Sequence, residues 1–225
     1  MNIDQKLRQG ETMPAIYVVF GTLLLLLFAY SKIVRPRQLT WGATAAEAAE
    51  TRIGDEIVQH PHFVATRAVT IAAPPAEVWK WILQIGSARA GWYSLDLLDN
   101  GNVPSSWDIL PEFQKIEIGG FIPFTPDQKN GMWVKEYREF DYILWWDQKG
   151  AGTWGWYLEA TADGGARLIT RLRTRYTLSF PWLLYYLVYD FGDIVMMRKC
   201  LQGIKARAER AVMPVIADEA APAHS

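Results

Sequence analysis

The chain has 225 residues, with 23 basic and 24 acidic side chains, a net charge of −1 and 50% hydrophobic residues. Such a length is typical of one domain of ordinary size with an additional segment. The charge balance argues against nucleic-acid binding, which requires a basic surface. The single cysteine, Cys200, excludes an internal disulfide framework and a multi-cysteine zinc site. The 11 Trp, 10 Tyr and 9 Phe residues predict a large apolar interior or contact with a membrane interface.

The N-terminus contains a long uncharged segment. Residues 1–11 form a charged tail, and residues 12–31 contain no charged side chain. As a helix, residues 12–31 span ~30 Å, the thickness of the hydrocarbon core, so we expect a single-pass transmembrane helix. A cleaved signal peptide is the alternative, because Ala29-Tyr30-Ser31 resembles a cleavage site. Two basic residues precede the segment and three follow it closely, a bias that predicts a cytoplasmic domain.

Residues 32–62 have the composition of a linker. Within them, Thr44 and Glu47 have the spacing of a capping box, which predicts a short helix from this point. His60 and His62 are two residues apart and would suit a metal ion. Because no cysteine or carboxylate cluster accompanies them, we interpret this stretch as a solvated linker and expect no metal site.

Residues 63–212 have the pattern of an α+β domain, and residues 213–225 that of a flexible tail. A run rich in β-branched residues predicts a strand over 63–71, and Pro75 can open a helix over 76–85. Turns that contain glycine separate the later apolar runs, which favours antiparallel hairpins. The remaining predicted elements are strands at 121–124, 132–138, 142–147, 153–160 and 166–178, and a long helix at 183–212.

The last predicted strand alternates almost strictly between two kinds of side chain. Leu168 and Leu172 share one parity, and Arg171 and its neighbouring arginines share the other. This period of two predicts one covered face and one solvated, charged face. The adjoining strand places Trp154 and Trp156 on one parity, so we expect these residues to face inward together with the leucines.

Four segments of the chain resemble a known superfamily: RAVTIAAPPAEVWKWILQIG, AGWYSLDLLDN, ILPEFQ and MRKCLQGIKARAER. Together they are similar to the polyketide cyclase/dehydrase and lipid-transport branch of the START-like (SRPBCC) superfamily, over roughly residues 40–212. The resemblance implies a helix-grip fold, in which a curved antiparallel sheet wraps around a long C-terminal helix and an apolar cavity lies between them. No catalytic motif of the superfamily matches this chain residue by residue, and the fold hosts both binders and enzymes.

The sequence offers few groups for catalysis. It lacks a phosphate-binding loop, a dinucleotide fingerprint, an HExxH motif and a nucleophile elbow. The acid–base candidates are therefore carboxylates, namely Asp96, Asp190 and Asp193, with Asp99 close by. If such carboxylates are buried, their pKa rises and they can exchange protons near neutral pH. A solvated or purely structural role is the alternative for each of them.

Aromatic and aliphatic side chains on the predicted elements are candidates for the wall of a ligand cavity. They are Trp79, Trp133, Trp146, Trp154, Trp156, Leu172, Tyr176, Leu187 and Phe191. A filled core is the alternative interpretation. We expect three further residues at the cavity mouth or at a membrane interface: Trp81, Trp145 and Trp182.

The sequence thus favours a membrane-anchored protein that binds or transports a hydrophobic small molecule, such as a lipid, an isoprenoid or a polyketide-like compound, without a metal or cofactor. One alternative is a cyclase/dehydratase-type enzyme that uses Asp, Tyr and Arg groups. Another is a non-catalytic accessory subunit that packs against a membrane-protein partner. The scarcity of His and Cys favours binding over catalysis, and the sequence does not specify the ligand or the oligomeric state.

Overall fold

The computed structural model describes residues 3–177, 179–180 and 182–213, and of residues 3–15 and 182–191 it describes the backbone alone. The chain divides into two compact units, Met1–Leu39 and Thr40–Ser225, and each is described by itself.

The N-terminal unit is helical. It consists of α1 (Ile3–Ala29), a π-helical turn (Tyr30–Val34) and α2 (Arg35–Leu39). Within the described part of the chain, one helix, Ile16–Leu39, is long and apolar enough to cross a membrane, and none of its most apolar stretch is buried. An unburied apolar helix near the N-terminus is compatible with a signal sequence and with the membrane anchor predicted at residues 12–31.

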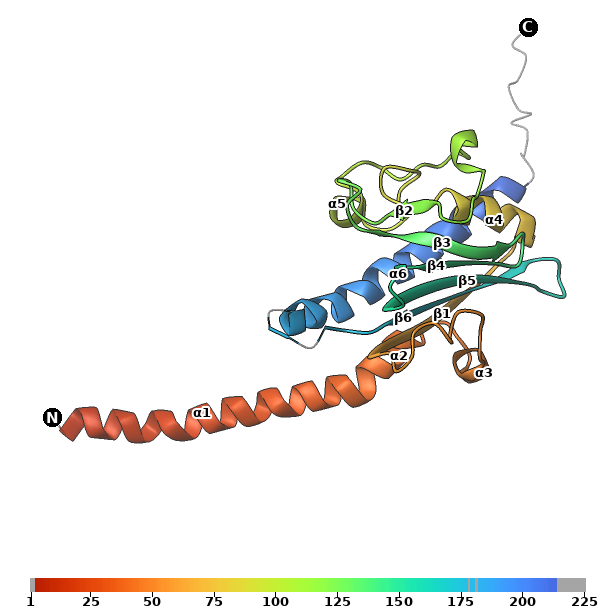
Figure 1. The fold of residues 1–225 in the computed structure, drawn as a ribbon. Helices are drawn as coiled ribbons and strands as arrows, with labels where there is room; N and C mark the ends of the chain where they lie inside the picture. The colour runs from red at the N-terminus through yellow and green to blue at the C-terminus, as the bar shows by residue number, and fades with distance from the viewer. Residues whose placement is uncertain (1–2, 178, 181, 214–225) are drawn as a thin grey trace, which may run out of the picture. The chain divides into compact units, whose positions relative to one another are not determined.

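The C-terminal unit is built on a six-stranded antiparallel sheet with the order β1-β6-β5-β4-β3-β2 (Figure 1). From β2 to β6 each strand pairs with the next one in the chain, and β6 then pairs with β1. The sequence-based prediction of antiparallel strands is confirmed, although the last strand ends at Thr174 and not at residue 178. The strands are β1 (Phe63–Ile71), β2 (Phe121–Pro123), β3 (Gly131–Arg138), β4 (Tyr142–Trp146), β5 (Gly152–Ala160) and β6 (Ala166–Thr174).

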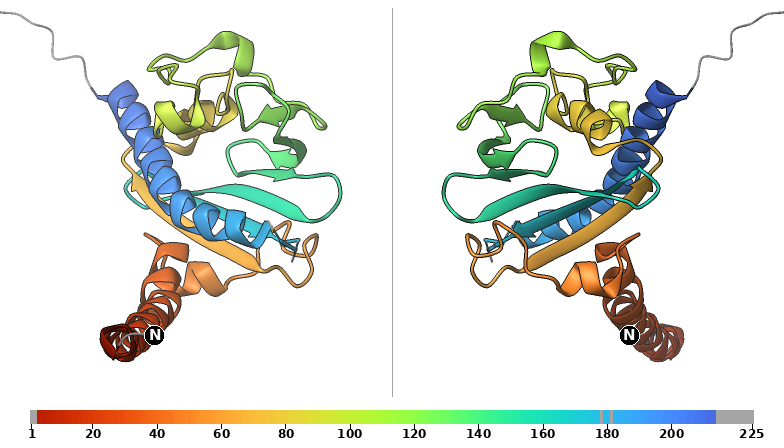
Figure 2. Two further views of the ribbon diagram at one scale, coloured as in Figure 1. Left: turned by 90° about the vertical axis from the view of Figure 1, so that its left-hand side faces the viewer. Right: turned by 90° about the vertical axis from the view of Figure 1, so that its right-hand side faces the viewer.

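Helices complete an α+β, helix-grip-like fold. The long C-terminal helix runs across one face of the sheet (Figure 2), where it packs on β1 and on the helix after β1, which in turn packs on β5 and β6. Pro75 begins that second helix, as expected from its missing N–H group. The helices are α3 (Ala45–Ala49), α4 (Pro75–Leu83), α5 (Asp96–Asp99), a 3-10 turn (Pro111–Phe113) and α6 (Trp182–Val212).

The strand register defines two faces of the sheet. Trp154 is paired with Leu172, and Thr170 is paired with both Trp156 and Arg67, so these side chains share one face. We call it the inner face, because Arg67 contacts α6 from it. The prediction that the tryptophans of β5 and the leucines of β6 face inward together is therefore correct.

The opposite, outer face differs from the sequence-based expectation. The predicted solvated arginine stripe is covered by residues 40–58, and only 3% of the Arg171 side chain is exposed. Arg171 pairs with Asp55 at 2.6 Å and donates hydrogen bonds to backbone carbonyls at the end of α3. Arg167 pairs with Glu47 at 2.7 Å. The alternation of β6 was read correctly, but the charged partners of its arginines lie more than 100 residues earlier in the chain.

The segment predicted as a linker is part of the domain. The capping box is confirmed: the Glu47 N–H donates to Thr44 Oγ1 at 3.1 Å, and the Thr44 N–H donates to the Glu47 carboxylate at 2.6 Å. Hydrogen bonds from Arg167 are the main reason that the pKa of Glu47 falls to about 2, with those from Thr44 acting in the same direction. The compact unit accordingly begins at Thr40 and not at Phe63.

Candidate functional site

A cluster of aromatic rings covers the centre of the inner face. Trp154 stacks on Trp156 and on Trp92, with ring centroids 5.1 and 5.6 Å apart, and Trp145 meets Trp154 edge-on at 5.5 Å. Phe124 closes the cluster against Trp92 and Trp154. Trp154 and Trp156 are alternate residues of β5, and Trp145 is the register partner of Trp154, so the pleat places the three indoles on one face.

The three indoles that β4 and β5 contribute to this cluster differ in their hydrogen bonding. Trp154 donates from Nε1 to Thr170 Oγ1 at 2.7 Å, and Thr170 donates in turn to the Gly155 carbonyl at 3.1 Å. By contrast, the buried Nε1 groups of Trp145 and Trp156 have no hydrogen-bond acceptor among the described residues. Because buried polar groups normally find a partner, two such donors on an otherwise apolar surface mark a place where a ligand acceptor could bind.

A buried ion pair lies between the cluster and α6. Arg67 of β1 projects from the inner face, and its Nη2 lies 2.6 Å from Oδ2 of Asp193 on α6. The side chains are 2% and 6% exposed, so both charges are removed from water. In a buried ion pair, the attraction between the two charges offsets the large free-energy cost of removing them from water. The loss of either partner therefore destabilises the fold.

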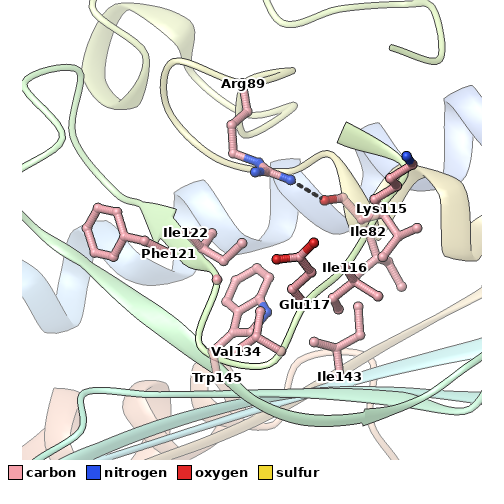
Figure 3. A pocket seen from close by; sticks show the side chains of 12 residues that line it. Ile82, Arg89, Lys115, Ile116, Glu117, Phe121, Ile122, Val134, Ile143 and Trp145 are labelled. Carbon is pink, nitrogen blue, oxygen red and sulfur yellow. Dashed lines mark hydrogen bonds between the residues drawn. The ribbon is translucent and has the colours of Figure 1, made fainter. Parts of the chain in front are cut away.

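A small cavity opens beside the aromatic cluster (Figure 3). Its volume is about 50 Å³, and it lies between α4, the segment 115–120 and strands β2 to β4. Trp145 belongs to both the cavity wall and the aromatic cluster, so the two features are continuous. The lining side chains are mostly apolar, with three charged residues among them: Ile82, Leu83, Arg89, Lys115, Ile116, Glu117, Phe121, Ile122, Val134, Ile143 and Trp145.

The structure separates the residues that we predicted as cavity wall. Leu172, Trp154 and Trp156 are buried on the inner face, but they pack against neighbouring side chains and do not line the cavity. Trp133 and Trp146 are register partners on the outer face, because Trp146 follows the inward Trp145. Both are half-buried.

The other predicted wall residues are dispersed as well. Trp79 of α4 is buried and meets Phe140 edge-on at 6.0 Å. Tyr176 follows the end of β6, where its ring stacks on His62 at 6.0 Å and its N–H donates to the imidazole. The side chains of Leu187, Phe191 and Trp182 lie outside the described residues. Trp81 and Trp145, expected at a cavity mouth or membrane interface, are both buried, but Trp145 does line the cavity.

The acidic candidates have distinct surroundings. Asp96 accepts hydrogen bonds from the N–H and the hydroxyl of Ser105, so it fixes the loop after α5. Asp193 forms an ion pair with Arg67, and the side chain of Asp190 lies outside the described residues. Asp99 is buried, and neither of its carboxylate oxygens has a hydrogen-bond partner within the described ranges. Burial is the main cause that raises the pKa of Asp99 to about 6, and the nearby Asp96 charge acts in the same direction.

The remaining groups of chemical interest among the described side chains are possible metal ligands and the single thiol. No group of three or more His, Cys, Asp or Glu residues there is arranged to hold a metal ion. Cys200 is buried, and this burial raises the pKa of its thiol well above the usual range.

Sequence reasoning missed Arg67 and Arg89 as site residues, and it expected Trp145 at a cavity mouth or membrane interface and not in the cavity wall. For Arg67 a signal was available, because a charged residue at an inward position of an apolar strand requires a buried partner. For Arg89 the spacing gave no indication, since the cavity that it lines joins α4, β4 and a loop that are distant in the sequence.

No protein-family model and no curated protein matches the sequence. Solved structures with a similar arrangement include EF2215 from Enterococcus faecalis, a conserved protein of unknown function. It shares 17% sequence identity with this chain, and the match covers 70% of this chain and 77% of EF2215, with a TM-score of 0.39. Protein SSP2350 from Staphylococcus saprophyticus shares 12% identity over 68% of this chain and 96% of its own, also with a TM-score of 0.39. Protein NE0264 from Nitrosomonas europaea shares 14% identity over 66% and 95%, with a TM-score of 0.40. These values do not support the transfer of any function.

Proposed function

We propose that the domain binds a hydrophobic small molecule on the inner face of its sheet, at the cavity beside Trp145, and that the apolar N-terminal helix anchors it to a membrane. The observation that carries the proposal is the buried indole N–H group of Trp145, a residue of the cavity wall, which has no acceptor among the described residues; the N–H group of the neighbouring Trp156 lacks one as well. A buried donor that lacks a partner costs about 1–3 kcal/mol. A ligand oxygen placed against the aromatic cluster would recover that cost while its carbon skeleton covers apolar surface.

The cavity has to enlarge before a lipid-sized ligand can bind. Sites for drug-sized ligands typically measure about 300–1,000 Å³, whereas this cavity measures about 50 Å³. Its outer wall is the segment 115–120, which is mostly exposed and is connected to β3 by two backbone hydrogen bonds between Val134 and the Gly119–Gly120 pair, each 2.8 Å long. In our proposal a lipid-sized ligand enters by displacing this segment, because the remaining walls belong to α4 and to the sheet.

The proposal places the domain in the polyketide cyclase/dehydrase and lipid-transport branch of the START-like superfamily, on the sequence resemblance of residues 40–212. With the helix as a single-pass anchor, the domain is confined near the bilayer, and the effective concentration of a lipid-like ligand at its cavity rises. The charge bias around the helix favours a cytoplasmic domain.

The decisive experiment is the identification of a bound molecule. The full-length chain, purified from membranes, is extracted with organic solvent, and the extract is analysed by mass spectrometry. Val134→Trp fills the cavity, since Val134 is buried in its wall. The control, Val103→Trp, adds the same ring at an exposed position outside the cavity.

We expect one apolar compound, near one equivalent per chain, to be present in the wild type and in Val103→Trp and to be absent from Val134→Trp. A compound retained equally by both variants would place binding elsewhere. A well-folded wild type that carries no compound would favour the catalytic alternative, and an empty protein that co-purifies with a stoichiometric membrane protein would favour the accessory-subunit alternative.

A further inference from the structure

Arg89, at the cavity wall, is a cation that has no carboxylate partner among the described residues. Its Nη2 donates to the Leu83 carbonyl at 2.6 Å, and its guanidinium lies 4.5 Å from the ring centre of Phe113. Its Nε atom is buried without a hydrogen-bond partner, and no carboxylate of the described residues lies within 4.0 Å of the group. Burial lowers the pKa of Arg89, but a guanidinium keeps its charge in proteins. The cavity wall therefore holds a partly desolvated positive charge that the described chain does not neutralise.

The local backbone holds Arg89 in this position. Gly86 and Gly91 exchange backbone hydrogen bonds of 3.1 and 3.2 Å, and the Arg89 N–H donates to the Gly86 carbonyl. Gly86 has a φ of +133°, and a Cβ atom there would lie 2.9 Å from Cδ of Arg89. A glycine at this position thus gives the Arg89 side chain the room to run back toward α4 and the cavity (Figure 3).

The charges around the cavity do not balance. Arg89 and Lys115 contribute two positive charges, and Glu117 contributes one negative charge. All other lining residues are uncharged, and Trp145 adds an indole N–H without an acceptor among the described residues. The cavity therefore combines an apolar wall with a net positive rim, an arrangement that suits a molecule with an apolar body and an anionic end.

We infer that the ligand of this site is an amphiphile with an anionic oxygen group, such as a carboxylate, which Arg89 and Lys115 hold at the rim while the apolar part lies against Ile143 and Trp145. The inference rests on the proposed function and specifies its ligand class. Arg89 supplies directional donors, and Lys115, which is exposed, supplies a mobile charge. Glu117 opposes binding by repulsion between like charges.

The test compares octanoate with octanol, because the two probes have chains of equal length and differ in the charge of the head group. The full chain in lipid nanodiscs is titrated with each probe by calorimetry, and empty nanodiscs correct for partitioning into lipid. Octanoate should bind about tenfold more tightly than octanol, the effect of one charge-assisted hydrogen bond. Arg89→Gln should abolish this difference, and Glu117→Gln should enlarge it.

Three further variants separate a direct effect on binding from an indirect one. Arg89→Lys keeps the charge and should retain part of the preference for octanoate, whereas a loss equal to that of Arg89→Gln together with a lowered melting temperature would indicate a folding defect. In that case Lys115→Gln, which changes an exposed side chain, provides the test and should weaken octanoate binding alone. Lys199→Gln removes an exposed charge of α6 outside the cavity wall and should change neither affinity.

The outcomes separate this inference from the proposed function. Equal affinity for octanoate and octanol would overturn the anionic head group and leave apolar binding intact. Failure of both probes to bind would overturn the proposed function as well. Inorganic phosphate that binds as tightly as octanoate, while octanol does not bind, would overturn the amphiphile in favour of a free anion.

Discussion

The guanidinium of Arg67 and the carboxylate of Asp193 meet at 2.6 Å between the sheet and α6, and both side chains are buried. The contact connects the first strand of the domain to its last helix, 126 positions apart in the chain. It lies on the face that carries the aromatic cluster, because Arg67 is the register partner of Thr170 and Thr170 accepts the Trp154 hydrogen bond. The pair thereby fixes where α6 crosses the aromatic surface.

The first prediction concerns this pair. Arg67→Met removes the guanidinium that faces the buried Asp193 carboxylate at 2.6 Å and should lower the free energy of unfolding by about 3–5 kcal/mol. Urea unfolding followed by circular dichroism measures this change. The double variant Arg67→Met/Asp193→Leu removes both charges and should recover most of the loss. Equal losses in the single and the double variant would show that side-chain volume, and not the unpaired charge, determines the effect.

The second prediction concerns the outer face. Asp55 accepts from Arg171 at 2.6 Å and lies 3.5 Å from Arg173, so Asp55→Ala leaves a nearly buried guanidinium without its carboxylate. We expect faster amide hydrogen exchange in residues 40–58 and a loss of about 1–3 kcal/mol. The control is Glu50→Ala, at an exposed carboxylate whose ion-pair partner among the described residues is Arg52 alone, and it should change amide exchange little. Unchanged protection of residues 40–58 in Asp55→Ala would contradict a role for this contact in holding the segment.

Comparison of β6 with its surroundings shows what the sequence can predict. The alternation of its side chains identifies the strand and both of its faces, because that period is a local property of the backbone. Which segment covers each face depends on tertiary contacts. The arginines of one face form ion pairs and hydrogen bonds with α3 and Asp55. The segment that buries them has the composition of a linker, so its sequence alone does not predict this contact.

The same distinction applies to the candidate site. The prediction that Trp154 and Trp156 face inward is correct, because both lie on one strand with an unambiguous pattern. Trp133 and Trp146 were expected on the same side, yet Trp145 takes the inward position of β4, and two adjacent tryptophans give no indication of which one does so. The cavity itself depends on how α4 and the segment 115–120 meet the sheet, which no local pattern encodes.

The third prediction uses the two tryptophans of β5 as a matched pair. Trp154→Phe and Trp156→Phe remove similar volumes, but the first variant also loses the 2.7 Å hydrogen bond to Thr170. We therefore expect Trp154→Phe to be more destabilising than Trp156→Phe by about 1 kcal/mol in chemical unfolding. Equal unfolding free energies for the two variants would contradict the difference in hydrogen bonding.

The last prediction concerns pH and Asp99. Burial raises the pKa of this carboxyl from 3.8 to about 6, so the folded protein binds a proton more tightly than the unfolded chain does. The contribution of Asp99 to the free energy of unfolding is therefore greatest below about pH 4, falls as the pH rises towards 6, and is constant above that value. Asp99→Asn keeps a neutral side chain of the same shape at every pH, so the stability of the variant relative to the wild type should increase between about pH 4 and about pH 7, by about 2 kcal/mol. Urea unfolding of both proteins at the two pH values measures the difference, and the other carboxyl groups cancel because they are common to both. A relative stability that is the same at both pH values would mean that the folded and the unfolded protein bind this proton equally. It would contradict an effect of burial on the Asp99 carboxyl.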